Sequence, residues 1–296
     1  LLSPTGSTAI VTDSKGITSF DVPNEGKWSV NPVTGAITFT PLPTFHKDPT
    51  LIQYNVKDND GNISNNARVT IDYVPVAAND RNTTPGTPGS TVALNVSGND
   101  TAGDTVDVST VELDASSVFG GIQVSPREVS VVGVGSWIAD AAGNVTFTPE
   151  TGYTIDPPVI NYTIKDNQGN NSNAATITID YAPITSPDSS IGNPINTPVV
   201  VDVTANDITG DLVDTTTVSL VNPGNGTNIV QDPTGDITSI TIPGEGRWNV
   251  DLVTGRVTFT PNPGFITDPT PINYNIKDNE GNVSNNSEIT IRVKPK

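Results

Sequence analysis

Short runs of alternating apolar and polar residues, separated by turn residues, recur along the chain. In one run Val257 and Phe259 face one side, while Arg256, Thr258 and Thr260 face the other. This alternation is the period of a β-strand. Trp248 and Val250 alternate in the same way, and the segment between the two runs ends at Gly255, which suits the positive φ of a bulged turn. The pattern predicts a hairpin whose strands each have one buried face.

The same reading extends to the rest of the C-terminal third of the chain. Tyr274 and Ile276 alternate with polar neighbours, and so do Ile289 and Ile291 after the loop 278–286. With further runs at 199–203 and 237–242, about seven or eight short strands fit into roughly 110 residues. The fold class predicted is all-β: tandem immunoglobulin-like β-sandwich repeats.

Two sequence blocks return three times in the same order. The first contains Trp28, Trp137 and Trp248, which are 109 and 111 residues apart. The second begins at Tyr54, Tyr162 and Tyr274, with the residues YNVKDNDGNISNN, YTIKDNQGNNSN and YNIKDNEGNVSNN. Recurrence at a fixed spacing indicates one structural unit per repeat, so the fold is a tandem array.

The repeat arithmetic sets three domains. We expect a partial repeat 1 at 1–74, a β-sandwich repeat 2 at 75–182 and a β-sandwich repeat 3 at 183–296. Leu1 aligns with Leu220, so the counterpart of 183–219 has no place in repeat 1. We therefore expect Leu1 to be internal to a longer product. If Leu1 is instead a processed terminus, the first sandwich lacks its opening strands. Its unpaired sheet edge would then accept a strand from a neighbouring chain and build a filament.

Each sandwich needs the same large residues in its interior. The predicted core consists of Trp28, Trp137, Trp248, Phe39, Phe147, Phe259, Tyr54, Tyr162 and Tyr274. A tryptophan can also serve as a platform for sugars, but recurrence at one strand position favours the core role. The repeats are joined at Val74-Pro75-Val76 and Ala182-Pro183-Ile184, and proline makes such joints stiffer than glycine and serine would.

The motif order resembles the CshA-type fibril repeats of giant bacterial surface adhesins. The resemblance rests on PGEGRWNVD from Pro243, VTGRVTFTP from Val253, Gly264-Phe265, DPTPI from Asp268 and the closing DNxGNxSN. It implies a cell-surface fibril in which stacked repeats project a binding tip from the bacterium. The asparagine-rich sequence is similar to the large adhesins of flavobacteria and other gliding bacteria. Repeat 2 departs from the pattern, since VGVGS from Val132 replaces the turn that carries the glutamate.

Composition and charge exclude several classes of function. The net charge of −18 and the pI near 4.1 argue against nucleic acid or an anionic membrane as partner. No run approaches the roughly 18 apolar residues of a membrane span, and the absence of Cys removes disulfides and thiolate chemistry. The single histidine, His46, lacks partners for proton transfer or metal binding. We predict that the chain is not an enzyme and has no required cofactor.

Calcium is the one metal that the sequence suggests, because Ca²⁺ takes oxygen ligands from acidic loops. The loops NDTAGD from Asn99 and NDITGD from Asn206 each place two carboxylates four residues apart around a glycine. The candidate ligands are Asp100, Asp104, Asp207, Asp211, Asp80 and Asp188. The alternative is that these residues stabilise turns by bonding their own backbone. The EF-hand-like start at Asp58 fails, because the loop positions counted from Gly61 lack both required carboxylates.

Lys57, Lys165 and Lys277 recur in one strand, which raises the question of an isopeptide crosslink. Since Tyr274 and Ile276 point inward, strand alternation points Lys277 to solvent, whereas that chemistry needs a buried lysine. We expect no crosslink.

The preferred function is a structural stalk of a large secreted adhesin, extracellular at the bacterial cell surface. Its partners would be neighbouring repeats of the same long chain, with a host or matrix protein or polysaccharide bound through another region. The alternatives are a ligand-binding adhesive module and the strand-donated filament subunit. A loop tip that differs sharply between repeats and exposes an aromatic or apolar patch would favour the binding module. We expect no such loop tip, because no large aromatic residue in a single repeat stands out from the pattern.

Overall fold

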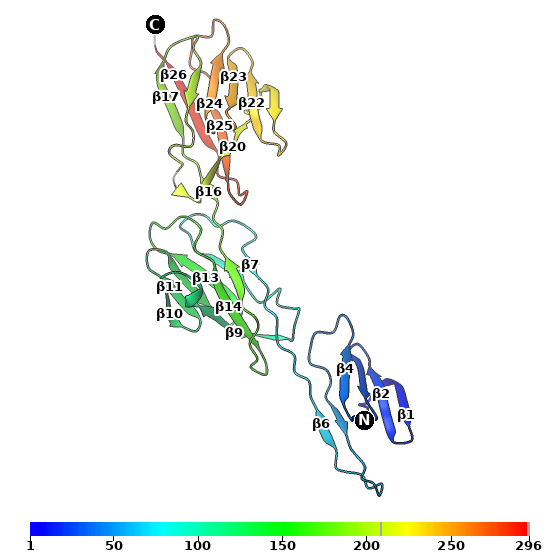
Figure 1. The fold of residues 1–296 in the computed structure, drawn as a ribbon. Helices are drawn as coiled ribbons and strands as arrows, with labels where there is room; N and C mark the ends of the chain where they lie inside the picture. The colour runs from blue at the N-terminus through cyan, green and yellow to red at the C-terminus, as the bar shows by residue number, and fades with distance from the viewer. Residues whose placement is uncertain (208, 295–296) are drawn as a thin grey trace.

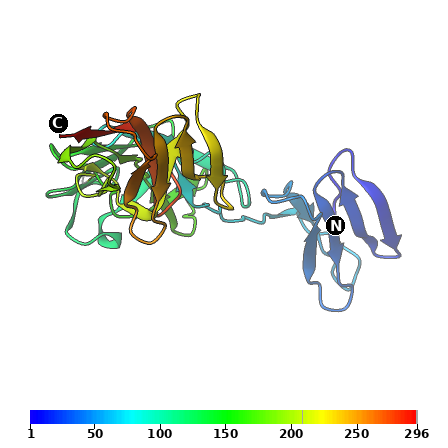
Figure 2. The ribbon, with the colours of Figure 1, turned by 90° about the horizontal axis from the view of Figure 1, so that it is seen from above.

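The computed structural model describes residues 1–207 and 209–294, which form three β-rich repeats arranged one after another (Figure 1). Seen from above, repeats 2 and 3 overlap while repeat 1 lies to one side (Figure 2). Among the described residues, no helix is long and apolar enough to cross a membrane. The chain is therefore an extended array of small all-β units.

Repeat 3 is a sandwich of two sheets. One sheet has the order β18 (Val199–Val201), β24 (Val257–Pro261), β23 (Gly246–Val250), β22 (Ile237–Ile242) and β21 (Thr227–Gln231). The other has the order β17 (Asp188–Asn193), β26 (Ser287–Val293), β25 (Ile272–Asp278) and β20 (Val213–Val221). The short pair β16 (Pro183–Ile184) and β19 (Thr209–Gly210) lies at the end that meets repeat 2 (Figure 1). The opening strand β17 runs parallel to the last strand β26, which ties the two ends of the repeat together.

Repeat 2 repeats this architecture. Its five-stranded sheet has the order β10 (Gly121–Ser125), β11 (Glu128–Val131), β12 (Gly135–Ala139), β13 (Asn144–Pro149) and β8 (Val92–Asn95). Its four-stranded sheet has the order β7 (Asp80–Arg81), β15 (Ala175–Thr178), β14 (Ile160–Asp166) and β9 (Val106–Asp114). A single 3-10 turn at Ala115–Ser117 precedes β10.

Repeat 1 contains only part of the sandwich. Its sheets are β1 (Thr8–Asp13), β2 (Gly16–Val22), β3 (Gly26–Val30) and β4 (Ile37–Pro41), then β5 (Ile52–Tyr54) with β6 (Ala67–Val69). Leu2 forms a bridge to Gln53, at the same register at which Val221 pairs with Asn273 in repeat 3. The alignment of Leu1 with Leu220 therefore holds in three dimensions.

The hairpin predicted around Trp248 is present in every repeat. Trp248 pairs with Phe259, and Trp137 and Trp28 pair with the equivalent phenylalanines. Gly255 has φ +71°, and its N–H donates to the carbonyl oxygen of Asp251 at 2.8 Å. The glycine is needed because a side chain at this φ is strained.

The three tryptophans are fully buried, as predicted, with each indole 4.6–4.9 Å from its paired phenylalanine ring. Two members of the predicted core are only half-buried, namely Phe39 and Tyr54 of repeat 1. The prediction was wrong for them because, among the described residues, repeat 1 has no counterpart of β17 and β18 and only Leu1 and Leu2 from the end of the β20 counterpart, and these strands cover the equivalent positions in repeat 3. Full burial of these aromatic rings depends on both sheets.

Candidate functional site

The joint between repeats 2 and 3 gathers five acidic side chains. Asp156 and Asp180 belong to repeat 2, while Asp211, Asp278 and Glu280 belong to repeat 3. Carboxylate oxygens of Asp156, Asp180 and Glu280 lie within 4.8 Å of one another, and so do those of Asp211, Asp278 and Glu280. Glu280 belongs to both groups, so the two groups form one continuous acidic cluster, which we call the acidic joint.

Hydrogen bonds cross this joint directly. The backbone N–H of Asp156 donates to Oδ1 of Asp211 at 3.5 Å, and the side-chain amide of Asn282 donates to Oδ1 of Asp180 at 2.8 Å. Arg81 forms an ion pair with Asp180 from within repeat 2. The acidic joint therefore holds one cationic side chain against five carboxylates, and each repeat supplies contacts that hold the other in place.

Burial and nearby like charges raise the pKa of three of these carboxyl groups, Asp156, Asp211 and Glu280. The pKa of Asp156 is raised to about 7, mainly by burial and also by the neighbouring charges of Asp211 and Asp180, while the N–H of Tyr181 acts in the opposite direction. Burial also raises the pKa of Asp211 and of Glu280. A hard cation would relieve this repulsion, and clustered carboxylate oxygens are the ligands that Ca²⁺ prefers.

The joint between repeats 1 and 2 is built in the same way but carries less charge. The N–H of Asp48 donates to Oδ1 of Asp104 at 3.4 Å, and the amide of Asn170 donates to Oδ1 of Asp72 at 3.0 Å. Gln168 stands where repeat 3 has a glutamate, and its amide donates to Asp48 at 2.5 Å. Among the described residues, groups of three acidic side chains close enough for one ion occur only at the acidic joint.

The structure separates the six predicted calcium ligands. Asp104 and Asp211 lie at the joints, where each accepts a hydrogen bond from the preceding repeat. The other four lie inside the sandwiches, where they surround a buried tyrosine hydroxyl; they are Asp80, Asp100, Asp188 and Asp207. The loop 206–211 contains residue 208, which lies outside the described residues.

Sequence reasoning missed four members of the acidic joint: Asp156, Asp180, Asp278 and Glu280. Asp156 and Asp278 belong to recurring motifs, so a signal was present. Asp278 was placed at the start of the loop 278–286, and its carboxylate accepts the N–H groups of Glu280 and Asn282. The sequence did not show that the end of one repeat would face the loops of the next.

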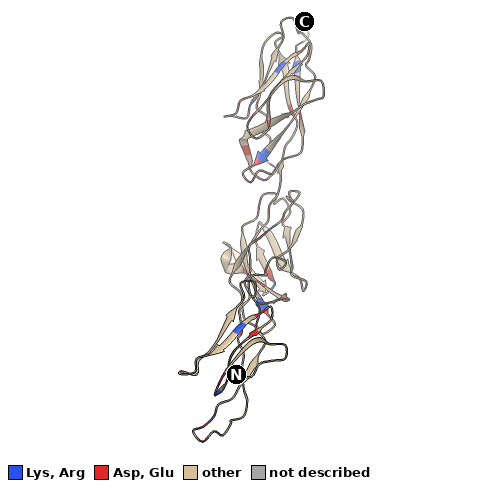
Figure 3. Ribbon diagram, turned by 90° about the vertical axis from the view of Figure 1, so that its right-hand side faces the viewer, with Lys and Arg blue, Asp and Glu red and all other residues tan. Residues whose placement is uncertain are grey.

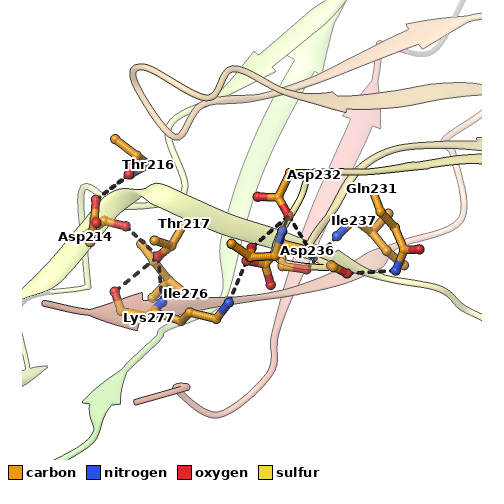
Figure 4. A network of polar contacts seen from close by, with 12 residues as sticks. Asp214, Thr216, Thr217, Gln231, Asp232, Asp236, Ile237, Ile276 and Lys277 are labelled. Carbon is orange, nitrogen blue, oxygen red and sulfur yellow. Dashed lines mark hydrogen bonds and ion pairs between the residues drawn. The ribbon is translucent and has the colours of Figure 1, made fainter. Parts of the chain in front are cut away.

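The lysines of the recurring strand differ from the expectation. Lys277 does not extend freely into solvent: its Nζ lies 2.6 Å from Oδ2 of Asp236, and the two side chains are 23% and 14% exposed (Figure 4). Lys165 pairs similarly with Glu112 at 2.7 Å. The neighbouring hairpin covers this face of β25, because the turn after β21 carries Asp236 over the lysine. Each of these ammonium groups is therefore held in an ion pair.

One loop tip of repeat 2 exposes a large aromatic residue. Phe119 is 101% exposed, between the 3-10 turn and the strand β10. Val132 is 78% exposed in the turn after β11, and Gly121 pairs with Val131 immediately before that turn. Repeat 3 has NPGNGT from Asn222 and Pro243-Gly244 in the corresponding segments. The expectation that no single repeat exposes a large aromatic residue was therefore wrong. The exposure of Phe119 depends on the packing of its loop, which the alternation of residues does not show.

Taken together, the three repeats define a class of protein: tandem immunoglobulin-like modules. The family model for the surface adhesin CshA repetitive domain matches residues 3–77 and 197–288, and the model for a bacterial Ig domain matches residues 72–180. The CshA matches together span more than half of the chain, so the chain belongs to the surface adhesin CshA repetitive-domain family. Both families consist of non-enzymatic domains, and the chain is not an enzyme.

Solved structures resemble the chain only in general architecture. Human desmocollin-1 ectodomain matches at 12% identity and a TM-score of 0.26, over 96% of this chain and 55% of that one. Extracellular domains 3–5 of Drosophila OTK match at 11% identity and a TM-score of 0.35, over 99% of both chains. The I9–I11 tandem of titin matches at 11% identity and a TM-score of 0.23, over 93% and 91%. A search of curated proteins gave no match.

Proposed function

We propose that the chain is a stalk segment of a secreted adhesin, which carries a binding region away from the bacterial cell. The observation that supports this most directly is that each joint is bonded from both sides, so adjacent repeats are held end to end. The prolines of the linkers and the excess of Asp and Glu over Lys and Arg along the array (Figure 3) suit a stiff, well-hydrated spacer.

Two measurements test the stalk. Small-angle X-ray scattering of the chain should give a maximum dimension close to that of the extended array, and it should stay the same as the protein is diluted. Binding assays against immobilised matrix proteins and polysaccharides should give no saturable signal. Scattering from a collapsed particle, or saturable binding spread over all three repeats, would contradict a spacer role.

A ligand-binding module is the second candidate function, and the exposed tip of repeat 2 favours it. Exposed aromatic residues next to apolar neighbours are typical of interaction sites, and Phe119 and Val132 occur together only in repeat 2. If repeat 2 binds a host protein or polysaccharide, Phe119→Ala should weaken binding at least tenfold without changing the melting temperature. The exposed Val253→Ala in repeat 3 is the matched control. Equal binding by both variants would rule out this loop tip as the binding site.

The filament subunit completed by a donated strand stays a prediction. Among the described residues, β4 has no partner on the edge where β24 pairs with β18. Mass spectrometry of the native product tests it, since an intact mass well above 30.9 kDa excludes the processed subunit.

Calcium also stays a prediction, and its expected position is now the acidic joint. Adding 1 mM Ca²⁺ at pH 7.5 should raise the melting temperature, and EDTA should reverse the rise, because an ion held by both repeats binds only the folded array. Asp211→Asn should remove most of the response, whereas Asp60→Asn, in an exposed turn, should keep it. An unchanged melting temperature in wild type with Ca²⁺ and with EDTA would exclude calcium.

A further inference from the structure

A buried tyrosine hydroxyl in repeat 2 is surrounded by hydrogen-bond acceptors. The hydroxyl of Tyr162 lies 2.9 Å from the carbonyl oxygen of Ala78 and 2.7 Å from that of Val96. It also lies 2.8 Å from Oδ2 of Asp80 and 3.3 Å from both carboxylate oxygens of Asp100. A phenol carries one hydrogen, so it can donate to only one of these partners. The N–H of Ala78 donates to Oδ1 of Asp100 at 2.7 Å. The single phenol hydrogen is therefore shared among the carboxylate of Asp80 and the two carbonyl oxygens.

Repeat 3 contains the same arrangement. The hydroxyl of Tyr274 lies 2.7 Å from the carbonyl oxygen of Val203, 3.1 Å from that of Ser186 and 3.0 Å from Oδ2 of Asp207. Asp188 is 9% exposed, and its Oδ2 is buried without any hydrogen-bond partner. An unpaired buried carboxylate oxygen is costly, so the missing donor is an independent observation in this repeat.

Among the residues that the structure describes, no positive side chain pairs with these two carboxylates. Asp80 faces Asp100 and Asn99 of the loop after β8, and Tyr162 of β14, while the adjacent Arg81 pairs with Asp180. In repeat 3 the corresponding neighbours of Asp188 are Asn206, Asp207 and Tyr274, and the more distant Asp202 pairs with Arg256. Two like charges buried together are unfavourable unless one is neutralised.

A proton fits this space better than a metal ion. In repeat 2 the tyrosine hydroxyl oxygen lies 2.7–3.3 Å from two carbonyl oxygens, from Oδ2 of Asp80 and from both carboxylate oxygens of Asp100, so it occupies the position between them that a cation would need. A protonated carboxyl gains an O–H donor and loses its charge, which supplies both missing features at once.

We propose that each complete repeat holds one extra proton between its two buried aspartates and its tyrosine, and that this proton fastens the opening strand to the sandwich. Asp80 and Asp188 begin the strands β7 and β17, which run parallel to the last strands of their repeats. Losing the proton therefore loosens the strand that follows each joint.

The direction of the pH effect follows from burial. Burial raises the pKa of Asp80 and of Asp188 to about 6, against an ordinary value near 3.8. A carboxyl with a raised pKa stabilises the fold fully below its unfolded pKa, and this stabilisation is lost as the pH rises through the folded pKa. The two repeats should therefore become more stable when the pH falls from 7.5 to 5. Asp156 at the acidic joint contributes in the same direction, so variants must separate the two effects.

The test compares melting temperatures of the chain at pH 7.5 and 5.0 in EDTA. In the wild type, the unfolding constant of each complete repeat should fall by about tenfold at pH 5.0, a shift of roughly 5 °C. The double variant Asp80→Asn with Asp188→Asn replaces one charge per repeat with a neutral amide. At pH 7.5 this variant should melt no lower than wild type. It should lose most of the rise in melting temperature that wild type shows at pH 5.0. The control is Glu150→Gln with Glu288→Gln, two exposed carboxyls, which should retain the gain.

Three results would overturn the proposal. The first is a double variant that is destabilised at pH 7.5 and keeps the full gain at pH 5.0. The second is a Ca²⁺-induced rise in melting temperature at pH 7.5 that the double variant abolishes, since this would make the occupant a cation. The third needs no variant: carboxyl ¹³C NMR of the wild type should give titration midpoints well above 4 for Asp80 and Asp188, and finding both ionised at pH 5 refutes the shared proton.

Discussion

Replacing Trp248 with alanine is expected to lower the free energy of unfolding of repeat 3 by about 4 kcal/mol. The indole is fully buried and packs 4.8 Å from the ring of Phe259, so its removal leaves a large cavity between the two sheets. Since a domain of this size has roughly 5–15 kcal/mol of stability, most of it would be lost. Urea denaturation should show one transition moving to much lower denaturant, while that of repeat 2 stays in place.

The control for Trp248→Ala lies in the turn between β23 and β24 of the same repeat. Val253 is 80% exposed, so Val253→Ala should change the stability by less than about 0.5 kcal/mol. If Trp248→Ala abolishes folding of repeat 3, limited proteolysis should degrade 183–294 and leave repeat 2 intact. A loss below about 1 kcal/mol would mean that the tryptophan is not the centre of the core.

Replacing Gly135 with alanine should destabilise repeat 2 by about 3 kcal/mol. A Cβ at this position would lie 2.4 Å from the carbonyl oxygen of Thr148, and the residue has φ +151°. The strands β12 and β13 would have to separate beside Trp137, and an L side chain would also be strained at this φ. The shift of the repeat 2 transition in urea measures the cost.

Gly98→Ala is the matched control in the same repeat. Its Cβ would meet only the side-chain oxygen of Asn95, at 3.3 Å, and no backbone atom within 4 Å. We expect a change of less than about 1 kcal/mol. Similar losses in the two glycine variants would show that the close approach of β13 at Gly135 has no special cost.

Much of the fold follows from local pattern. The alternation of Val257 and Phe259 predicted their burial, and the spacing of the three tryptophans predicted that each repeat has the same core residue. The loop 278–286 was also predicted, and the carboxylate of Asp278 at its start accepts the N–H groups of Glu280 and Asn282. These features depend on neighbours within about five residues, so the period of the sequence contains them.

The acidic joint could not be derived in this way. Asp156 and Asp211 are separated by more than fifty residues and belong to different repeats, and their contact depends on the angle at which the repeats meet. The same limit applied to the calcium ligands. Asp100 and Asp104 share one loop, yet Asp100 bonds a tyrosine within its own sandwich and Asp104 bonds the preceding repeat. Spacing along the loop gave no means of telling these directions apart.

The sequence by itself determined the all-β class, the three repeats, the hairpins and the buried tryptophan of each core, because period and recurrence are properties of the linear chain. Only the tertiary structure decided which acidic side chains meet at the joints, which share a buried hydroxyl, and that Phe119 is exposed. These depend on how separate strands and separate repeats pack against one another, and burial and charge act through those distances rather than through position in the chain.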